Sequence, residues 1–570
     1  MICKTRFVLF TVSAALAIFA GCAQPPAEPV SERRDAAQQQ PATPQARRDI
    51  RGQAEYRAAE LPMTVTVHKS QMGSTGTVAG DLRLPSEPLN RENYADFDDN
   101  PVQRVAENPV STFSIDVDTG AYANVRRLLR AGQLPPQDAV RAEELINYFS
   151  YEYDAPGERG TPFSVTREIA PAPWNADNYL LHIGVQGYRP APREVPNANL
   201  VFLIDVSGSM NSPDKLGLLK TSLQLLTRQL DADDSVSMVV YAGASGVVLE
   251  PTPGNQRARI IAALDRLQAG GSTNGGAGIN LAYAMAEQAF IPDGINRVLL
   301  ATDGDFNVGT TNIEMLKDLV EEKRNSGIAL TTLGFGTGNY NDHLMEQIAD
   351  VGNGNYAYID TLNEAQKVLV DELHSTMLTI AKDVKIQIEF NPAVVAEYRL
   401  VGYENRLLRR EDFNNDKIDA GEIGAGHSVT AVYEISLVGS RGQLTDPLRY
   451  QDGAASAPQG DEIAYLKMRY KEPESSQSRL LEWAIERAEI LDDVHEASED
   501  FRFSAAVAAF AQRLRGGDYT GEFTFADITT LANSARGKDP YGYRGEFIGL
   551  VALAGSLAQP EPLARAAGED

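Results

Sequence analysis

The chain has 570 residues, which is too long for one ordinary hydrophobic core, so we expect about two to four structured units. Its hydrophobic content of 43% and aromatic content of 8% are those of a globular protein. The formal net charge of -26 argues against nucleic acid as a partner, because phosphate binding requires clustered lysine and arginine. We attribute the acidity to solubility.

The first residues predict an exported protein. Lys4 and Arg6 precede an apolar run over residues 7–20, which is too short to span a bilayer. A short apolar run behind basic residues is typical of a secretory signal peptide, here residues 1–21.

The residues FAGC at the processing point resemble the bacterial lipoprotein signal, in which the mature chain begins at a lipid-modified cysteine, here Cys22. Phe19 stands where Leu, Val or Ile is usual, and an ordinary signal peptide that contains a cysteine is the alternative. The resemblance implies a cell-envelope protein with a lipid anchor in the membrane. Ala23 after the cysteine implies outer-membrane retention if the host is a diderm bacterium, facing the periplasm or the surface.

Residues 22–92 are predicted to be the lipidated cysteine and a disordered tether. The basis is the stretch from residue 23 to about 59, which is rich in Pro, Gln, Ala and Arg and has almost no apolar periodicity. The chain has only two cysteines, Cys3 and Cys22, so cleavage leaves a mature chain without a disulfide.

An α+β extension is predicted over residues 93–197. The stretch STFSIDVDTGAY has strand alternation, and ANVRRLLRAG and AVRAEELINYF have helical spacing. FSVTREIA and YLLHIGVQGY then alternate apolar and polar residues as strands do.

Strand and helix signals alternate over residues 198–377, as in a parallel α/β sheet. The candidate strands are LVFLID, SVSMVVYA, RVLLATD, ALTTLGFG and GNYAYID. The first and third are almost continuously apolar, as strands buried on both faces should be. Leucines at three- and four-residue steps from Leu216 to Leu230 predict an amphipathic helix between the first two strands.

Strict alternation returns over residues 378–475, in VKIQIEF, SVTAVYEI and YLKMRY. We hypothesise that these strands pair with those before residue 198 and form a β-sandwich that the α/β unit interrupts. Residues 476–560 are predicted to be helical from about Ser478, and a Thr524–Asp527 capping pattern begins a helix that stops before Gly537.

Three separated stretches of the α/β unit carry oxygen-bearing side chains at the ends of strands or in a Gly-rich loop. They supply Asp205, Ser207 and Ser209 in DVSGSM, Thr273 in GGSTNGG, and Asp303 in TDGD. In an open parallel sheet the loops at the carboxyl ends of strands meet in one crevice. Two carboxylates and three hydroxyls suit a hard cation such as Mg²⁺, and they leave a coordination position open to an acidic group from outside.

Together these stretches resemble the metal-ion-dependent adhesion site of von Willebrand factor type A domains. The resemblance implies that Asp205, Ser207, Ser209, Thr273 and Asp303 contact the metal, directly or through water, and that a carboxylate of a protein ligand completes its shell. Mg²⁺ is the expected ion, with Mn²⁺ and Ca²⁺ left open. The alternative is a set of capping and turn residues whose metal site has decayed, but decay usually removes a ligand and none is missing here.

More broadly, residues 95–553 resemble an uncharacterised bacterial family in which such a domain sits between N- and C-terminal extensions. The resemblance rests on the stretches STFSIDVDTGAYANVRRLL, TDGDFNVG, GFGTGNYND, GNGNYAYID and DPYGYRGEF. The expected fold class is therefore α/β, a doubly wound and mostly parallel Rossmann-like sheet flanked by a β-sandwich-like region and a C-terminal helical region.

Other motifs indicate ordinary turns. DVDTG at residues 116–120 has Gly120 where the phosphatase nucleophile loop needs Thr or Val. DFNNDKIDAGEI from Asp412 resembles a calcium loop but has Lys417 and Ile423 where Gly and Glu are required. The six histidines show no zinc spacing, and no serine lies in a nucleophile elbow.

We therefore expect a membrane-tethered binding module, not an enzyme, that captures the Asp or Glu carboxylate of a protein partner through a divalent cation. The alternatives are a structural envelope scaffold with a stabilising metal and a metal-dependent hydrolase. The absence of a candidate base beside the site argues against the hydrolase.

Overall fold

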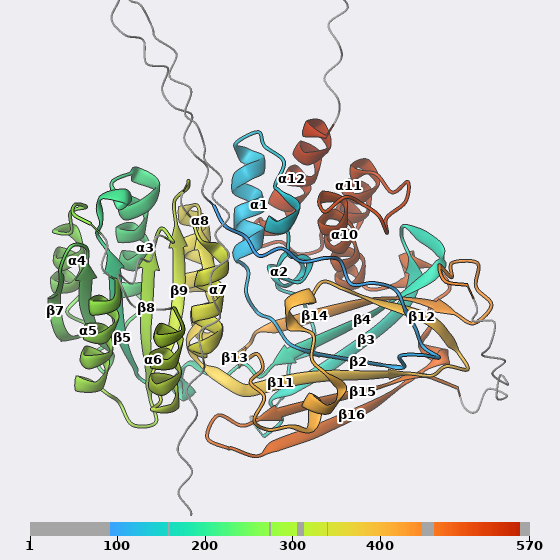
Figure 1. Ribbon diagram of the computed structural model, residues 1–570, viewed down its shortest axis with the longest axis horizontal. Helices are drawn as coiled ribbons and strands as arrows, with labels where there is room; N and C mark the ends of the chain where they lie inside the picture. Colours follow the sequence, from blue (N-terminus) through green and yellow to red (C-terminus); the bar gives the residue numbers. More distant parts are fainter. Residues whose placement is uncertain are drawn as a thin grey trace, which may run out of the picture. The chain divides into compact units, whose positions relative to one another are not determined.

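The structure is a computed structural model that describes residues 92–558, except 158–159, 273–274, 305–312, 339 and 447–460. The predicted signal peptide, Cys22, nearly all of the tether and Thr273 lie outside these residues. The described residues form an α/β unit, two five-stranded sheets and a group of helices (Figure 1).

The α/β unit contains a six-stranded sheet with the strand order β10-β9-β8-β5-β6-β7. Neighbouring strands are parallel except β7, which is antiparallel to β6 and was not predicted. Every residue of β5 and β8 is buried, which explains their continuous apolar sequences. The strands are β5 (Ala198–Asp205), β6 (Ser235–Tyr241), β7 (Ser245–Pro253), β8 (Ile295–Thr302), β9 (Ala329–Phe335) and β10 (Tyr356–Ile359).

Helices cover both faces of this sheet, so the prediction of a doubly wound, mostly parallel fold is confirmed. Side chains alternate along β5: Phe202 packs in one core with α3 and α4, and Leu203 packs in the other with α5 and α6. A π-helical turn, Lys367–Asp371, joins α8 to α9. The helices are α3 (Leu218–Thr227), α4 (Arg257–Asp265), α5 (Gly275–Gln288), α6 (Ile313–Asn325), α7 (Asp342–Val351), α8 (Leu362–Gln366) and α9 (Leu373–Met377).

Strands from both sides of the α/β unit form a β-sandwich, as hypothesised. One sheet has the order β1-β12-β14-β4-β3, and the other has the order β13-β11-β15-β16 with β2 also paired to β11. The pairings β4–β14 and β2–β11 each join a strand from before residue 198 to one from after residue 377.

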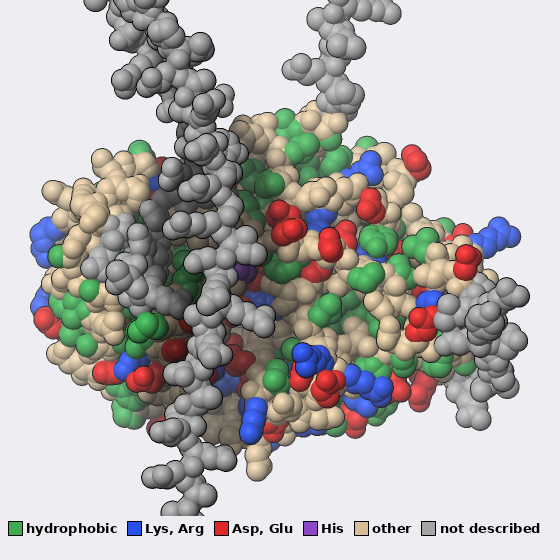
Figure 2. Space-filling view, in the orientation of Figure 1, with side chains coloured by type: hydrophobic (Ala, Val, Ile, Leu, Met, Phe, Trp, Pro, Cys, Tyr) green, Lys and Arg blue, Asp and Glu red, His purple; other side chains and the backbone are tan. Residues whose placement is uncertain are grey.

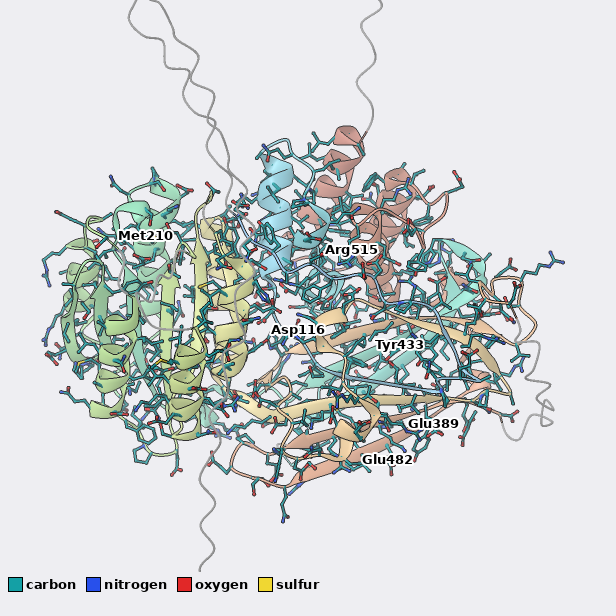
Figure 3. The ribbon with its side chains drawn as sticks, viewed as in Figure 1. Asp116, Met210, Glu389, Tyr433, Glu482 and Arg515 are labelled. Carbon is teal, nitrogen blue, oxygen red and sulfur yellow. The ribbon has the colours of Figure 1, made fainter. Side chains whose placement is uncertain are left out.

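The strands of the sandwich are β1 (Gln103–Arg104), β2 (Val110–Ser114), β3 (Phe163–Ala172), β4 (Asn175–Gly187), β11 (Thr379–Phe390), β12 (Val395–Val401), β13 (Ile423–Gly424), β14 (Ser428–Leu437), β15 (Glu462–Lys471) and β16 (Ser478–Glu486). The inward-facing side chains of both sheets share one core, in which Ile386 and Leu466 from one sheet lie with Val185 and Tyr433 from the other. Tyr433 is labelled in Figure 3.

The prediction of a helical region from residue 476 is wrong for β16, which pairs antiparallel with β15 from Glu462↔Glu486 to Lys471↔Ser478. Leu481, Ala484 and Ile485 fit a helical period, but Leu481, Trp483 and Ile485 also alternate as a strand does. Hydrogen bonding to the neighbouring β15 decides between the two periods. The β-rich region therefore extends to Glu486.

The C-terminal helices pack with two helices from the N-terminal extension over one face of the β4-containing sheet. These helices are α1 (Gly120–Arg130), α2 (Ala142–Asn147), α10 (Glu499–Leu514), α11 (Phe525–Ser534) and α12 (Tyr543–Leu557). The Thr524–Asp527 capping box at the start of α11 is confirmed. In the described part of the chain, no helix has both the length and the hydropathy to cross a membrane.

A pair of leucines on neighbouring strands tests the sandwich core. Leu466 on β15 is fully buried, whereas Leu480 on β16 is 40% exposed. We expect Leu466→Ala to lower the free energy of unfolding by about 2–5 kcal/mol, because it leaves a cavity between the sheets. Leu480→Ala should change it by about 0.5 kcal/mol or less. Urea denaturation followed by circular dichroism measures both, and equal losses would contradict this core.

Candidate metal centre

Asp205 ends β5 at the carboxyl edge of the sheet, where the order of the strands reverses between β5 and β8. The parallel register places Ile204 opposite Ala301, so Asp205 lies beside Thr302. The Thr302 hydroxyl donates to Asp205 Oδ2 at 3.0 Å, and the Ser207 backbone N–H donates to Oδ1 at 2.8 Å. These two hydrogen bonds orient a fully buried carboxylate.

Burial raises the pKa of Asp205 to about 6. Hydrogen bonds from Ser207 and Thr302 oppose this rise in pKa, and the negative charge of Asp303 adds to it. Two carboxylates in one buried crevice repel each other, so a bound cation would stabilise the charged form of both.

Ser207 and Ser209 lie on the turn that follows β5. Their Oγ atoms are 3.0 Å apart, and Ser207 is buried whereas Ser209 is exposed. Two adjacent ligands of an octahedral Mg²⁺ ion are also about 3.0 Å apart when each metal–oxygen distance is about 2.1 Å. Met210, fully buried after the second serine, holds this turn against the core of the α/β unit (Figure 3).

The Gly-rich loop before α5 is bonded to the same turn. The Gly208 N–H donates to the Gly271 carbonyl at 3.0 Å, and the Gly270 N–H donates to the Val206 carbonyl at 2.8 Å. Gly271 has a φ of +90°, a conformation that favours glycine. Thr273 itself lies outside the described residues, but the described loop ends next to it, at Ser272.

Asp303 follows β8 and is fully buried. Its Oδ2 accepts a hydrogen bond from Lys215 Nζ at 2.9 Å, and Lys215 is only 7% exposed. Sequence reasoning missed Lys215 and Thr302 as parts of the site. Lys215 lies in an irregular π-helical turn, Pro213–Gly217, so no period in the sequence points its side chain toward Asp303.

The structure thus brings Asp205, Ser207 and Ser209 together. Asp303 is the next residue after Thr302, whose hydroxyl donates to Asp205. All of the donor atoms are oxygens, two of them from carboxylates, which fits a hard divalent cation and not zinc or another soft metal.

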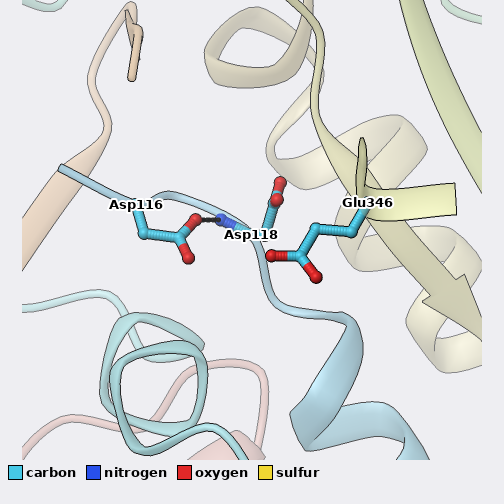
Figure 4. Close-up of side chains that lie close together, drawn as sticks. All are labelled: Asp116, Asp118 and Glu346. Carbon is cyan, nitrogen blue, oxygen red and sulfur yellow. Dashed lines mark hydrogen bonds between the residues drawn. The ribbon is translucent and has the colours of Figure 1, made fainter. Parts of the chain in front are cut away.

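A second acidic cluster lies outside this centre. Carboxylate oxygens of Asp116, Asp118 and Glu346 lie within 4.8 Å of one another (Figure 4). The guanidinium of Arg406 contacts all three, at 3.2 Å, 3.4 Å and 3.3 Å. The chain therefore supplies its own cation to this cluster.

Hydrogen bonds to the backbone support a structural role for DVDTG at residues 116–120. Asp116 Oδ1 accepts the backbone N–H of Asp118 at 3.0 Å, and Asp118 Oδ1 accepts that of Tyr356 at 2.8 Å. Burial and the neighbouring carboxylates raise the pKa of Asp118, and Arg406 opposes this rise. These residues form a turn, as the sequence indicated, and Asp118 also bonds to Tyr356 of the α/β unit.

Arg406 is one of three arginines that bind acidic residues of the α/β unit; Arg126 and Arg141 are buried, and the side chain of Arg406 is 12% exposed. Arg126 pairs with Asp360 and Glu364, Arg141 pairs with Asp342 and Glu346, and Arg406 pairs with Glu346 and Asp350. All three arginines come from outside the unit. Helix α7 presents Asp342, Glu346 and Asp350 on one face because they are four residues apart.

The calcium-like loop from Asp412 also binds cationic side chains of the chain itself. Lys385 donates to the carbonyls of Asp412 and Asn415, and Lys471 donates to that of Asp416. Lysine ammonium groups therefore take carbonyl oxygens of this loop, in agreement with the prediction of a turn.

A doubly wound sheet with this set of oxygens at its carboxyl edge defines a von Willebrand factor type A domain. Residues 199–372 match the family described as von Willebrand factor type A domain, and residues 88–182 match the one described as von Willebrand factor. Residues 375–557 match the family described as Uncharacterized protein YfbK, C-terminal.

The chain is 50% identical over 469 residues to Uncharacterized protein YfbK of Escherichia coli (strain K12), a match that covers 81% of this chain and 80% of that protein. The chain therefore belongs to the YfbK family.

The chain is also similar to more distant proteins. Human inter-alpha-trypsin inhibitor heavy chain H3 is 25% identical over 305 residues, which are 49% of this chain and 33% of that protein. The solved von Willebrand factor type A protein from Catenulispora acidiphila is 14% identical, with a TM-score of 0.36, and the match covers 68% of this chain and 89% of that one. The chain spans only a third of the inhibitor heavy chain.

Arg406→Met tests the buried ion pairs. We expect this change to lower the free energy of unfolding by about 3–5 kcal/mol, because it leaves buried carboxylates without their cation. Arg409→Met, at an exposed position three residues away, is the matched control and should change it by about 0.5 kcal/mol or less. Thermal and urea denaturation measure both variants, and similar small effects would show that Arg406 contributes little.

Proposed function

We propose that the type A domain of this chain binds a protein partner through a divalent cation held by Asp205, Ser207, Ser209, Thr273 and Asp303. A carboxylate of an Asp or Glu on the partner completes the coordination of the ion. Mg²⁺ is the proposed ion, and Mn²⁺ and Ca²⁺ are the alternatives. The observation that carries the proposal is the convergence of the described ligands at the carboxyl ends of β5 and β8.

The exposure of the centre suits binding of a macromolecule. Ser209 is exposed whereas Asp205, Ser207 and Asp303 are buried. A bound ion would therefore contact buried side chains on its protein side and solvent on the side of Ser209. The hydroxyls of Ser207 and Ser209 contact each other. This arrangement favours metal coordination over nucleophilic catalysis, in which a serine bonds to a base.

The surface charges support a protein partner over nucleic acid. On the face drawn in Figure 2, the described lysine and arginine side chains lie among aspartate and glutamate side chains. Nucleic-acid interfaces require basic side chains gathered on one surface.

The proposed location is the cell envelope, with a lipid on Cys22 anchoring the chain in the outer membrane. The support is the FAGC sequence after an apolar run and the Pro- and Gln-rich stretch that follows it. Such a tether would allow the folded part to reach partners away from the membrane.

Metal binding is tested with a conservative change of one ligand. Asp205→Asn removes a ligand charge while keeping the shape of the side chain, so we expect Mg²⁺ binding measured by calorimetry to weaken at least tenfold. Asp214→Asn is the matched control, because Asp214 is exposed on the adjacent turn and bonds to Ser212. It should bind Mg²⁺ as the wild type does. Equal affinity in all three proteins would refute the metal centre.

Partner capture is measured with the same proteins against envelope extract, with and without a chelator. We expect the wild type and Asp214→Asn to retain a partner in Mg²⁺ and to release it on chelation. Asp205→Asn should not retain it. If this variant loses thermal stability but captures the partner as the wild type does, the metal has a structural role and the scaffold alternative holds.

The lipid anchor has its own test. Cys22→Ser removes the proposed lipid acceptor, so the protein expressed with its own leader should move from the membrane fraction to the soluble envelope fraction. Cys3→Ser should stay with the membranes, because Cys3 lies inside the predicted signal peptide. Membrane association of both variants would contradict lipidation at Cys22.

A further inference from the structure

A positive charge built into the chain lies against the proposed metal centre. Lys215 Nζ donates to Asp303 Oδ2 at 2.9 Å, and the side chains of Lys215 and Asp303 are only 9% and 0% exposed. Because both groups are shielded from water, their interaction is stronger than that of a surface ion pair.

The position of Lys215 is set by packing. A Cβ atom at Gly336 would lie 2.2 Å from Cγ of Lys215, so the lysine stem occupies the space beside this glycine. Gly336 has a φ of +76°, which also favours glycine. The Lys215 N–H donates to the Ser212 carbonyl at 3.1 Å, and Leu216 next to it is buried in the core of the α/β unit. The lysine is therefore held in the crevice by its neighbours.

The charges of these groups determine what the loaded centre attracts. Asp205 and Asp303 carry two negative charges, which a divalent cation balances. Lys215 adds a positive charge beside them. This charge attracts a ligand carboxylate more strongly than a neutral carbonyl or hydroxyl, so the buried lysine favours an anionic ligand.

We propose that Lys215 is the residue that makes the metal-loaded centre selective for carboxylate ligands over neutral oxygen ligands. This inference rests on the proposed function, because it requires a cation at the centre. Lys215 is also a positioning residue, because its bond to Oδ2 helps to fix the orientation of the Asp303 carboxylate. Its positive charge repels the metal, so selectivity comes with weaker metal binding.

The test uses the full-length chain in detergent, with Mn²⁺ as the metal. Mn²⁺ speeds the relaxation of water protons while water is bound to it, so displacement of that water by acetate is measured directly, and acetamide is the neutral comparison. Lys215→Met removes the charge and keeps most of the stem, and Lys215→Arg keeps the charge. Lys220→Met is the matched control, because Lys220 on α3 bonds to the carbonyls of Asp265 and Leu267 and not to Asp303.

We expect Lys215→Met to bind Mn²⁺ at least as tightly as the wild type and to bind acetate roughly tenfold more weakly, with acetamide unchanged. Lys215→Arg and Lys220→Met should keep the preference of the wild type for acetate. Acetate binding within twofold of the wild type in Lys215→Met would overturn the proposal. Weaker Mn²⁺ binding in that variant would also overturn it, because Lys215 would then only support Asp303.

Two controls separate the possible failures. If Lys215→Met does not fold, as judged by circular dichroism, Lys215→Gln replaces it. Acetate binding within twofold of the wild type, or weaker Mn²⁺ binding, would then overturn the proposal in the same way. If the wild type binds Mn²⁺ no better than Asp205→Asn does, the proposed function fails, and with it the basis of this inference.

Discussion

The parallel pairing of β5 with β8 is the constraint on which the candidate metal centre depends. It fixes Ile204 opposite Ala301, so two strands that are about ninety residues apart in the chain end side by side. Asp205 ends β5 and Asp303 directly follows β8, and the Thr302 hydroxyl at the end of β8 donates to Asp205. Like charges brought together in a buried crevice repel each other, and this repulsion is relieved by a cation. The Ser207 and Ser209 hydroxyls, the Gly-rich loop and Lys215 all lie next to these two carboxylates or to the turn that carries Asp205.

A second electrostatic constraint connects the type A domain to the flanking regions. Arg126 in α1, Arg141 just before α2 and Arg406 in the turn after β12 lie outside the domain, and each binds two acidic residues inside it. Burying a charge is unfavourable unless it is paired, so these arginines specify where the domain contacts its neighbours. Both acidic clusters described above contact a cationic side chain of the chain: Arg406 at Asp116 and Lys215 at Asp303. They differ in exposure, because Ser209 beside Asp205 is exposed to solvent.

The type A domain is inserted into the sandwich, so the regions before and after it form one folded unit. Strands on either side of residues 198–377 complete each other: β4 pairs with β14, and β2 pairs with β11. Neither set could bury its apolar face alone, since the inward side chains of both sheets form one core. The helices of the two extensions are joined in the same way.

The sequence by itself determined the parts that depend on local pattern. Continuous apolar runs predicted β5 and β8, alternation predicted β11 and β14, and the Thr524–Asp527 spacing predicted the start of α11. The sequence also predicted that Asp205, Ser207, Ser209 and Asp303, the candidate ligands, lie at one edge of the sheet, because the carboxyl ends of parallel strands converge there. Pairing decided what local pattern could not: β16 has apolar residues that suit both a strand and a helix, and only β15 beside it selects the strand. Lys215 and the three arginines were invisible in the sequence for the same reason. Each is an ordinary charged residue until the fold buries it, and burial beside a carboxylate is what gives its charge a function.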